Sequence, residues 1–251
     1  KTQSVTQSDL EKRAHVDSQE SSEKAQHLNP VVQNHIRELF FNRGLSVTAL
    51  NNFLECSWKY FFVNLVRIPQ AQSKHQMFGT AMHAALRTFF DKYRAEEDMS
   101  VEAVCTLFKS ELSKQPLSDI LFKEELERGI EMLTTYIEYY TKQGGWVRNL
   151  YTEYSLRGVT LPLVYIDEQG KQIERDLPLT GNLDKIELLD DTQVNVVDYK
   201  TGNAKTRNEI MGLTALASGN EYRQLCFYRY LVDNDPQHKF TFASAELDFI
   251  Q

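Results

Sequence analysis

The sequence has 251 residues, 41% of them hydrophobic and 25% charged, and a formal net charge of −7. A chain of this length can form one large domain with a well-developed core. No apolar run approaches the ~20 residues that a membrane span needs, so the composition excludes a membrane protein.

The cysteines and the charge pattern limit the compartment and the partners that we expect for this protein. Its three cysteines lie far apart and form no CxxC pair, which indicates a protein of the reducing cytoplasm without a zinc or iron–sulfur site. The acidic net charge argues at first against a nucleic-acid partner. However, residues 30–75 and 199–230 each hold five basic residues against two acidic ones, whereas residues 91–140 hold twelve acidic residues against six basic ones. A local basic face is therefore compatible with the sequence.

The chain begins with a polar stretch. Its opening 29 residues mix Ser, Gln, Glu and Lys with few apolar side chains, and they lack the charged start and apolar core of a secretory signal. We assign residues 1–44 to a tail or linker and expect the sequence to be a piece of a longer protein. Residues 45–251 are assigned to a single domain.

Residues 45–143 show the 3.6-residue periodicity of helices. Ser46 is a candidate N-cap for a first helix, whose apolar positions continue at spacings of three and four until Pro69 closes it. A second helix follows Gly79. Two further helices are expected at about 100–114 and 119–142. This half of the domain is predicted to be a helical layer.

Gly144 and Gly145 end the helical run, and the apolar period then changes from 3.6 to 2 residues. Residues 146–251 are therefore expected to form the sheet core. Its predicted elements are strands at 151–166, 177–189 and 192–200, a loop at 203–220, a helix near 221–233 and a strand near 239–250. This order predicts an α/β fold in which a mixed β-sheet is flanked by helices, with an N-terminal helical layer.

The predicted strand at 192–200 ends in two charged residues, Asp198 and Lys200. Side chains at i and i+2 of a strand lie on one face, about 6.5–7 Å apart along the backbone, so the two project together. On the preceding strand, Asp184 lies on an otherwise apolar face. Two carboxylates on adjacent strands suit a hard cation such as Mg²⁺ or Mn²⁺, because burying them without a cation would be unfavourable. Lys200 is one candidate cationic partner, and it could also position a water or stabilise charge on a phosphoryl oxygen.

These residues resemble a known motif. Gly181-x-x-Asp184, followed by Asp198-Tyr199-Lys200-Thr201-Gly202, is similar to the signature of the PD-(D/E)XK nuclease superfamily, and "VVDYKTG" resembles its RecB-like branch. Three further segments resemble motifs of that branch in the expected order: "SVTALNNFLECSWKYFF", "FGTAMHAAL" and "YRQLCFYRYL". The resemblance covers about residues 45–250 and implies a restriction-endonuclease-like core.

The resemblance also implies roles for individual residues. The implied metal ligands are His83, Asp184, Asp198 and the carbonyl of Tyr199. The implied catalytic residues are Asp184, Asp198, Lys200, Gln224 and Tyr228, of which the last two share one helix face at spacing i, i+4. Glu153 occupies a place where some relatives carry an acid that helps to organise the site.

The implied activity is hydrolysis of DNA phosphodiester bonds with Mg²⁺ or Mn²⁺, leaving 5′-phosphate and 3′-hydroxyl ends. The resemblance further implies one part of a larger helicase–nuclease of DNA repair and recombination, which acts on single-stranded DNA or on single-stranded ends. The sequence holds no GxxxxGK[ST] loop, so a helicase motor would lie outside it, in the same or a partner chain. Some relatives bind an iron–sulfur cluster through one cysteine of the N-terminal helix and three near the C-terminus. Cys56 occupies the place of the first, but the other three are lacking here, so no cluster is expected and Cys56 is assigned to the core.

Other interpretations of the whole domain stay open. It could be a DNA-binding or scaffolding module that has lost catalysis on the same fold. The acidic residues 119–142 are most simply a solvated helix face, but they could also dock a protein partner.

Individual residues have simpler interpretations too. Asp198 and Lys200 could form a solvated ion pair at a strand end, and His83 could be a partly buried structural residue. The aromatic residues of the first helix could stack on single-stranded bases, but their helical spacing favours packing in the core. These residues are Trp58, Phe61 and Phe62.

Overall fold

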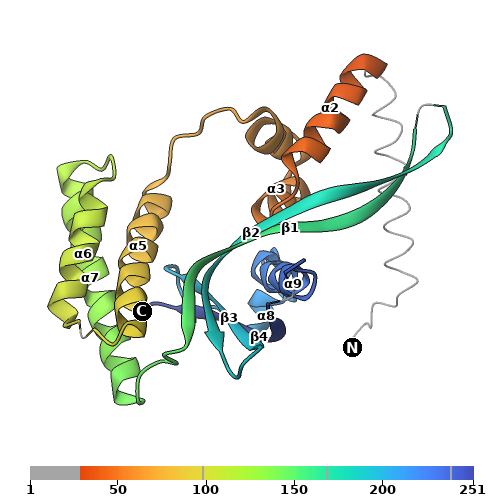
Figure 1. The fold of residues 1–251 in the computed structure, drawn as a ribbon. Helices are drawn as coiled ribbons and strands as arrows, with labels where there is room; N and C mark the ends of the chain where they lie inside the picture. Colours follow the sequence, from red (N-terminus) through yellow and green to blue (C-terminus); the bar gives the residue numbers. More distant parts are fainter. Residues whose placement is uncertain (1–28, 98, 168, 238) are drawn as a thin grey trace, which may run out of the picture. The chain divides into compact units, whose positions relative to one another are not determined.

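The computed structural model describes residues 29–97, 99–167, 169–237 and 239–251 (Figure 1). The chain divides into two compact units, of which the first ends at Arg43 and the second comprises Gly44–Gln251. Within the first unit, helix α2 (Pro30–Arg43) occupies a stretch that the sequence analysis assigned to a tail or linker. The rest of that assignment, residues 1–28, lies outside the described residues. No helix in the described ranges is long and apolar enough to cross a membrane.

The second unit begins with a helical segment that differs from the single helix predicted there. Ser46 caps α3 (Val47–Glu55) as expected, by accepting a hydrogen bond from the Ala49 backbone N–H. Cys56 then adopts an extended conformation, with φ −163° and ψ 119°, and this residue breaks the helix. A short α4 (Ser57–Tyr60) and a π-helical turn, η1 (Phe61–Val66), follow. The prediction of one continuous helix was wrong because the break depends on backbone geometry that apolar spacing does not report.

The burial of this segment also differs from the prediction. The Trp58 side chain is 65% exposed and the Phe62 side chain 42% exposed, so packing in the core was the wrong interpretation for both. Cys56 is exposed as well, which contradicts its assignment to the core. The residues that anchor the segment are instead Tyr60 and Leu65, which are both buried.

Three longer helices, α5 (Lys74–Arg94), α6 (Val101–Ser113) and α7 (Asp119–Lys142), complete the helical layer. The last two match their predicted ranges within one residue. Helix α5 begins earlier than predicted because Ser73 and Gln76 form a capping box at its N-terminus. Gly79 consequently lies inside α5, where a Cβ would be 3.7 Å from the Thr201 hydroxyl oxygen. The helix therefore passes close to the end of the third strand.

The sheet has four strands in the spatial order β1-β2-β3-β4. They are β1 (Leu150–Ile166), β2 (Gln172–Leu188), β3 (Gln193–Lys200) and β4 (Thr241–Phe249). The first three strands are antiparallel neighbours and β4 is parallel to β3, so the sheet is mixed, as predicted. Only the last part of β2, from Lys185 to Leu188, pairs with β3, and the rest of the β1–β2 ribbon extends beyond the sheet (Figure 1).

Helices cover both faces of the sheet (Figure 1). On one face, α5, α6 and α7 enclose a core that includes Phe78, Phe90 and Phe108 together with Val197 and Tyr199 of β3. The other face carries α9 (Asn220–Asp233), while a one-turn helix, α8 (Arg207–Ile210), lies in the predicted loop. A Cβ on Gly181 of β2 would overlap Leu231 of α9, so this glycine allows the helix to lie directly on the strand. Helices on both faces of a mixed sheet confirm the predicted α/β class.

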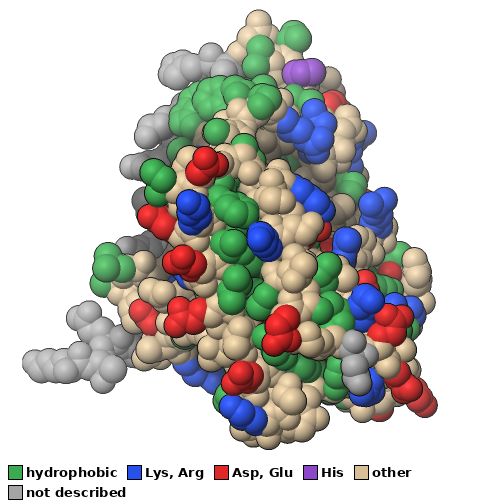
Figure 2. All heavy atoms as spheres, turned by 90° about the vertical axis from the view of Figure 1, so that its left-hand side faces the viewer, with side chains coloured by type: hydrophobic (Ala, Val, Ile, Leu, Met, Phe, Trp, Pro, Cys, Tyr) green, Lys and Arg blue, Asp and Glu red, His purple; other side chains and the backbone are tan. Residues whose placement is uncertain are grey.

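Figure 2 shows the face of the second unit over α6 and α7, where acidic and basic side chains are interspersed. Ion pairs explain part of this pattern, because Glu111 contacts Lys114 at 2.5 Å at the end of α6 and Glu138 contacts Lys142 at 3.4 Å along α7. The acidic composition of this segment therefore does not produce a continuous acidic surface on this face.

Candidate active site

The pairing of β2 with β3 brings the two predicted strand carboxylates together. Lys185 pairs with Val197, and continuing this register by one residue brings Asp184 to the level of Asp198. The Asp184 carboxylate accepts a hydrogen bond from the backbone N–H of Tyr199 over 2.9 Å. The sequence predicted only that these acids lie on adjacent strands, and the register of the strands makes them neighbours.

Asp198 is the centre of a polar cluster between β3 and α9. Its side chain is almost fully buried, and the Lys200 ammonium lies 2.6 Å from its Oδ2. Its Oδ1 accepts hydrogen bonds from the Gln224 amide over 2.8 Å and from the Tyr228 hydroxyl over 3.0 Å. The Gln224 carbonyl oxygen in turn accepts a hydrogen bond from Lys200 over 2.8 Å. Gln224 therefore holds the acid and the amine of the predicted motif at the same time.

The electrostatic state of Asp198 reflects this burial. Removal from water raises the pKa of the Asp198 carboxyl, the positive charge of Lys200 opposes the rise, and the nearby charge of Asp184 adds to it. The net result is a raised pKa. Asp198 Oδ2 also has no aligned hydrogen-bond donor among the described residues, although Lys200 is its ion-pair neighbour. An added cation would therefore stabilise the ionised form of this carboxyl.

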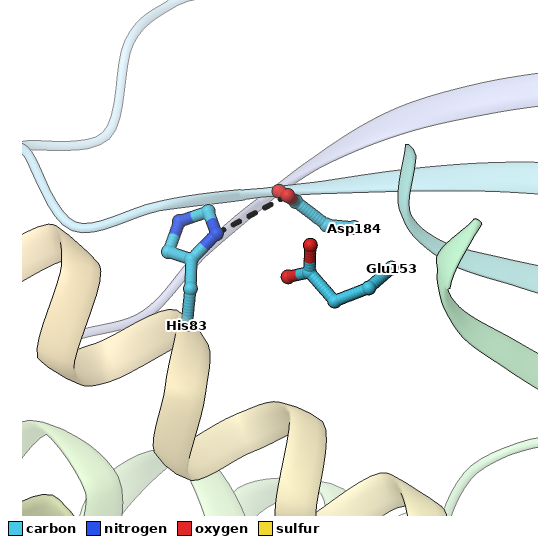
Figure 3. Close-up of side chains that lie close together, drawn as sticks. All are labelled: His83, Glu153 and Asp184. Carbon is cyan, nitrogen blue, oxygen red and sulfur yellow. Dashed lines mark hydrogen bonds and ion pairs between the residues drawn. The ribbon is translucent and has the colours of Figure 1, made fainter. Parts of the chain in front are cut away.

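A second cluster, next to the first, consists of His83 from α5, Glu153 from β1 and Asp184 from β2 (Figure 3). One ligand atom from each residue lies within 4.8 Å of the others. His83 Nδ1 lies 3.2 Å from Asp184 Oδ1, and the Glu153 carboxylate points toward the same space (Figure 3). The three side chains line a cleft of about 560 Å³ together with Gln76 and Gly79 of α5.

The backbone of Glu153 is unusual. Thr152 pairs with Lys185 and Tyr154 with Leu183, while Glu153 between them has φ +47°, a conformation that non-glycine residues rarely adopt. Such backbone strain concentrates at functional sites. The Asn182 side chain also donates a hydrogen bond to the Glu153 carboxylate.

Glu153 was expected only to help organise the site, and the ligand set named from the sequence did not include it. The signal in the sequence was an acid on the first strand. Its register against Asp184 and its backbone conformation are properties of the folded sheet.

His83 interacts with all three acids of the two clusters. Burial lowers the pKa of its imidazole, but the hydrogen bond to Asp184 and the negative charges of Asp184, Asp198 and Glu153 raise it by more, so the net shift is upward. Negative charge thus dominates the potential at this point, which is the condition under which a divalent cation binds.

The donor atoms of the second cluster fit a divalent metal ion. Carboxylate oxygens suit hard cations such as Mg²⁺ and Mn²⁺, and a neutral imidazole is a common additional ligand. Of the ligands named from the sequence, His83 and Asp184 lie in this cluster, and Asp198 lies in the neighbouring one. Tyr199 contributes its backbone N–H to Asp184, while its ring is buried on the α5 side of the sheet, with its centroid 5.8 Å from that of the His83 ring.

Comparison with known proteins supports the family. The model of the PD-(D/E)XK nuclease superfamily matches residues 44–247. The search of curated proteins returned no match. The superfamily implies a metal-dependent, nuclease-type function and generally uses divalent metals, and the helices around a four-stranded mixed sheet are consistent with its restriction-endonuclease-like fold. On the strength of a match over most of its length, this chain belongs to the PD-(D/E)XK nuclease superfamily.

Proposed function

We propose that this chain is a deoxyribonuclease that hydrolyses phosphodiester bonds with Mg²⁺ or Mn²⁺. The main support is the arrangement of Lys200, whose ammonium is held between Asp198 and Gln224 at the end of β3. A quarter of the Lys200 side chain is exposed, so the amine is fixed in position and still accessible to a substrate.

In this proposal the cation is held by His83, Glu153 and Asp184, with Asp198 and the Tyr199 carbonyl as the remaining candidate ligands. When bound, it supplies Lewis-acid stabilisation of the negative charge that develops on the phosphate. Glu153 is added to the ligands predicted from the sequence because its carboxylate lies in the cluster.

The other residues of the site orient and stabilise the reacting groups. Lys200 donates hydrogen bonds to a phosphoryl oxygen and stabilises its growing charge. Gln224 keeps Lys200 from rotating away, because its carbonyl accepts from the ammonium while its amide donates to Asp198. The Tyr228 hydroxyl donates to the same carboxylate, and a strongly raised pKa, caused mainly by burial, keeps this hydroxyl protonated.

We further propose single-stranded DNA, or DNA with single-stranded ends, as the substrate of a domain that works with a helicase motor in cytoplasmic DNA repair and recombination. The support is the resemblance of "VVDYKTG" and "YRQLCFYRYL" to the RecB-like branch, together with the basic excess of residues 199–230. Both the resemblance and the basic excess are properties of the sequence, so they support this proposal independently of the geometry of the cleft.

The test is cleavage by the purified chain. Labelled single-stranded DNA, duplex DNA and RNA are incubated with Mg²⁺, with Mn²⁺ or with EDTA. We expect metal-dependent cleavage of single-stranded DNA that Asp198→Ala and Lys200→Ala abolish. Matched controls are Asp176→Ala, an exposed strand aspartate, and Lys171→Ala, an exposed lysine in the β1–β2 hairpin, and both should cleave normally.

Two results would contradict the proposal. Full activity of either site variant would exclude the assigned roles. DNA binding by a folded wild-type chain, without cleavage in either metal, would instead favour the silent DNA-binding module.

A further inference from the structure

Two aromatic side chains of the helical segment before α5 are exposed side by side. Trp58 and Phe62, called here the aromatic pair, have ring centroids 5.8 Å apart and an interplanar angle of 21°. Phe61 contacts both rings edge-on, at 6.0 Å from Trp58 and 5.2 Å from Phe62. The pair forms an aromatic surface in contact with solvent, and contiguous exposed apolar surface often marks an interaction site.

The segment that carries the aromatic pair is firmly attached to the domain. Tyr60 and Leu65 are buried below it, and the side chains of Asn52 and Asn64 hydrogen-bond to each other over 3.0 Å. A local attachment of this kind fixes the direction in which the rings point. Their exposure is therefore a property of the folded segment and not of a loose end.

A further hydrogen bond connects this region to the catalytic cluster. The Arg223 guanidinium donates to Asn51 of α3 over 2.6 Å, and Arg223 directly precedes Gln224. The aromatic pair and the Asp198–Lys200 cluster are thus tied to each other through α3 and α9.

The charges around the aromatic pair are mainly basic. Lys59 lies between the two rings in the sequence, and Arg67 follows the π-helical turn in a left-handed conformation with φ +63°. The acid nearest in sequence, Glu55, is 2.7 Å from Lys59 in an exposed ion pair, which contributes little to stability. Arg67 forms no ion pair within the described ranges of the chain. Aromatic rings flanked by basic side chains match the bases and phosphates of a single strand.

The chain runs from the aromatic pair directly into the cleft of the second cluster. Gln72 and Gln76 line this cleft together with His83, Glu153 and Asp184. Phe62 and Gln72 are ten residues apart, so their Cα atoms are separated by at most about 36 Å even in a fully extended chain. The separation between the aromatic pair and the cleft is therefore within the reach of a short single strand.

We propose that Trp58 and Phe62 bind single-stranded DNA by stacking on its bases and direct the strand toward the cleft. Every base presents a flat face, so such a site binds without reading sequence. A double helix keeps its bases stacked on each other, and the aromatic pair consequently favours single strands over duplex. This inference rests on the proposed function for its substrate, and it adds the residues that select single strands.

The test measures binding in the absence of cleavage. Fluorescence anisotropy of a labelled oligothymidylate of about 20 nucleotides is followed with the full chain in EDTA. Removing an aromatic stacking partner weakens binding by about 5- to 140-fold per base, so we expect a loss of this size in Trp58→Ala and a larger one in the Trp58→Ala, Phe62→Ala double variant. Trp58→Phe should keep most of the affinity while losing the tryptophan quenching that accompanies binding.

A matched control separates this effect from a general loss of aromatic surface. Tyr139 on α7 is 59% exposed and lines neither the cleft nor the aromatic pair, so Tyr139→Ala should bind normally. Duplex DNA of the same length should bind equally to the wild type and to all variants. Circular dichroism confirms that each variant is folded.

This binding test and the cleavage test can fail separately, so their results distinguish the inference from the proposed function. Unchanged single-strand affinity in the double variant would overturn the inference, even if the wild type cleaves DNA with Mg²⁺. A loss of affinity in a chain that never cleaves would support the inference and contradict the proposed function. If the double variant abolishes self-association in sedimentation and leaves DNA affinity unchanged, the aromatic pair binds protein, and the inference is wrong.

Discussion

Two acid–amine pairs with the same i, i+2 spacing lie on adjacent strands and face opposite sides of the sheet. Lys185 and Glu187 of β2 contact each other at 2.7 Å on the face covered by α5. Asp198 and Lys200 of β3 contact each other at 2.6 Å on the face covered by α9. The spacing is the same in both, although the order of acid and amine is reversed, and the surroundings of the two pairs differ.

The pair on β2 is enclosed. Lys185 is only 1% exposed, and its ammonium lies 4.4 Å from the centre of the Phe90 ring and 5.7 Å from that of Tyr199. The second oxygen of Glu187 accepts a hydrogen bond from Asn195 over 3.1 Å. Each charge therefore has partners, and no ligand can reach the amine.

In the pair on β3 the acid is buried, whereas the amine is accessible to solvent. Asp198 is buried with a raised pKa, while Lys200 is 26% exposed at the end of the strand. Access to the amine and incomplete stabilisation of the acid therefore separate the candidate catalytic pair on β3 from the structural pair on β2. The spacing of the two residues does not.

The largest expected effect is the loss of cleavage in Lys200→Met. Removing a group that stabilises transition-state charge typically lowers the rate by about 10²–10³-fold, and we expect at least about 100-fold here. Gln224 and Tyr228 still donate to Asp198 in this variant, so its stability should fall less than that of Lys185→Met. Single-turnover cleavage assays and thermal unfolding measure the two effects. If Lys200→Met is strongly destabilised but cleaves normally per folded molecule, Lys200 is a structural residue and not a catalytic one.

The opposite pattern is expected for Lys185→Met. Removing one partner of a buried ion pair leaves an uncompensated charge on Glu187 and destabilises by about 3–5 kcal/mol, which corresponds to a fall of roughly 6–20 °C in the midpoint of thermal unfolding. Cleavage per folded molecule should be nearly unchanged below the transition.

Replacing both partners provides the control for this prediction. The double variant Lys185→Met, Glu187→Leu should recover most of the lost stability, because no unpaired charge is left buried. A double variant as unstable as the single one would show that the Lys185 contact with Phe90, and not the ion pair, carries the stabilisation.

The sequence predicted those parts of the fold whose stability depends on local pattern. Helices α6, α7 and α9 follow apolar periodicity, and strands β1 and β3 follow alternation. The break at Cys56 and the π-helical turn after it were missed, because both depend on how this segment packs. Apolar spacing also does not reveal whether a neighbouring element covers an aromatic side chain, and for this reason Trp58 was assigned to the core.

For the candidate site too, the sequence predicted the features that depend on local pattern and missed those that depend on packing. Asp198 and Lys200 share a face by strand period alone, and Asp184 follows once β2 and β3 are known to be neighbours. The position of Glu153 depends on the register of β1 against β2 and on a rare backbone conformation. The distinction between the two acid–amine pairs likewise depends on which rings and helices surround them, which the sequence does not state.

A smaller effect is expected for Glu153→Gln. This change keeps the shape of the side chain and removes one negative charge from the cluster with His83 and Asp184. Outer-shell changes alone weaken metal binding by about 10–100-fold, so the loss of a ligand charge should weaken Mn²⁺ binding by at least about tenfold. Isothermal titration calorimetry measures this affinity. Glu174→Gln, an exposed glutamate of β2, is the control, and equal affinities in the two variants would remove Glu153 from the ligand set.

The smallest effect, and the one that tests the incomplete stabilisation of the β3 acid, is a gain of stability in Asp198→Asn. Because the pKa of Asp198 is raised above the ordinary value of about 3.9, its protonated form stabilises the fold, and this stability is present below that value and lost as the pH rises through the raised pKa. The permanently neutral Asn avoids the loss. In EDTA at pH 7 the variant should therefore unfold at a higher temperature than the wild type, by about 2–4 °C for each kcal/mol gained, and the difference should vanish near pH 3. Scanning calorimetry between pH 3 and pH 8 measures it, with the exposed Asp176→Asn as a control that should show no such trend. A lower midpoint at pH 7 would mean that the ion pair with Lys200 outweighs the burial of Asp198, and the two acid–amine pairs would then be alike in their energetics.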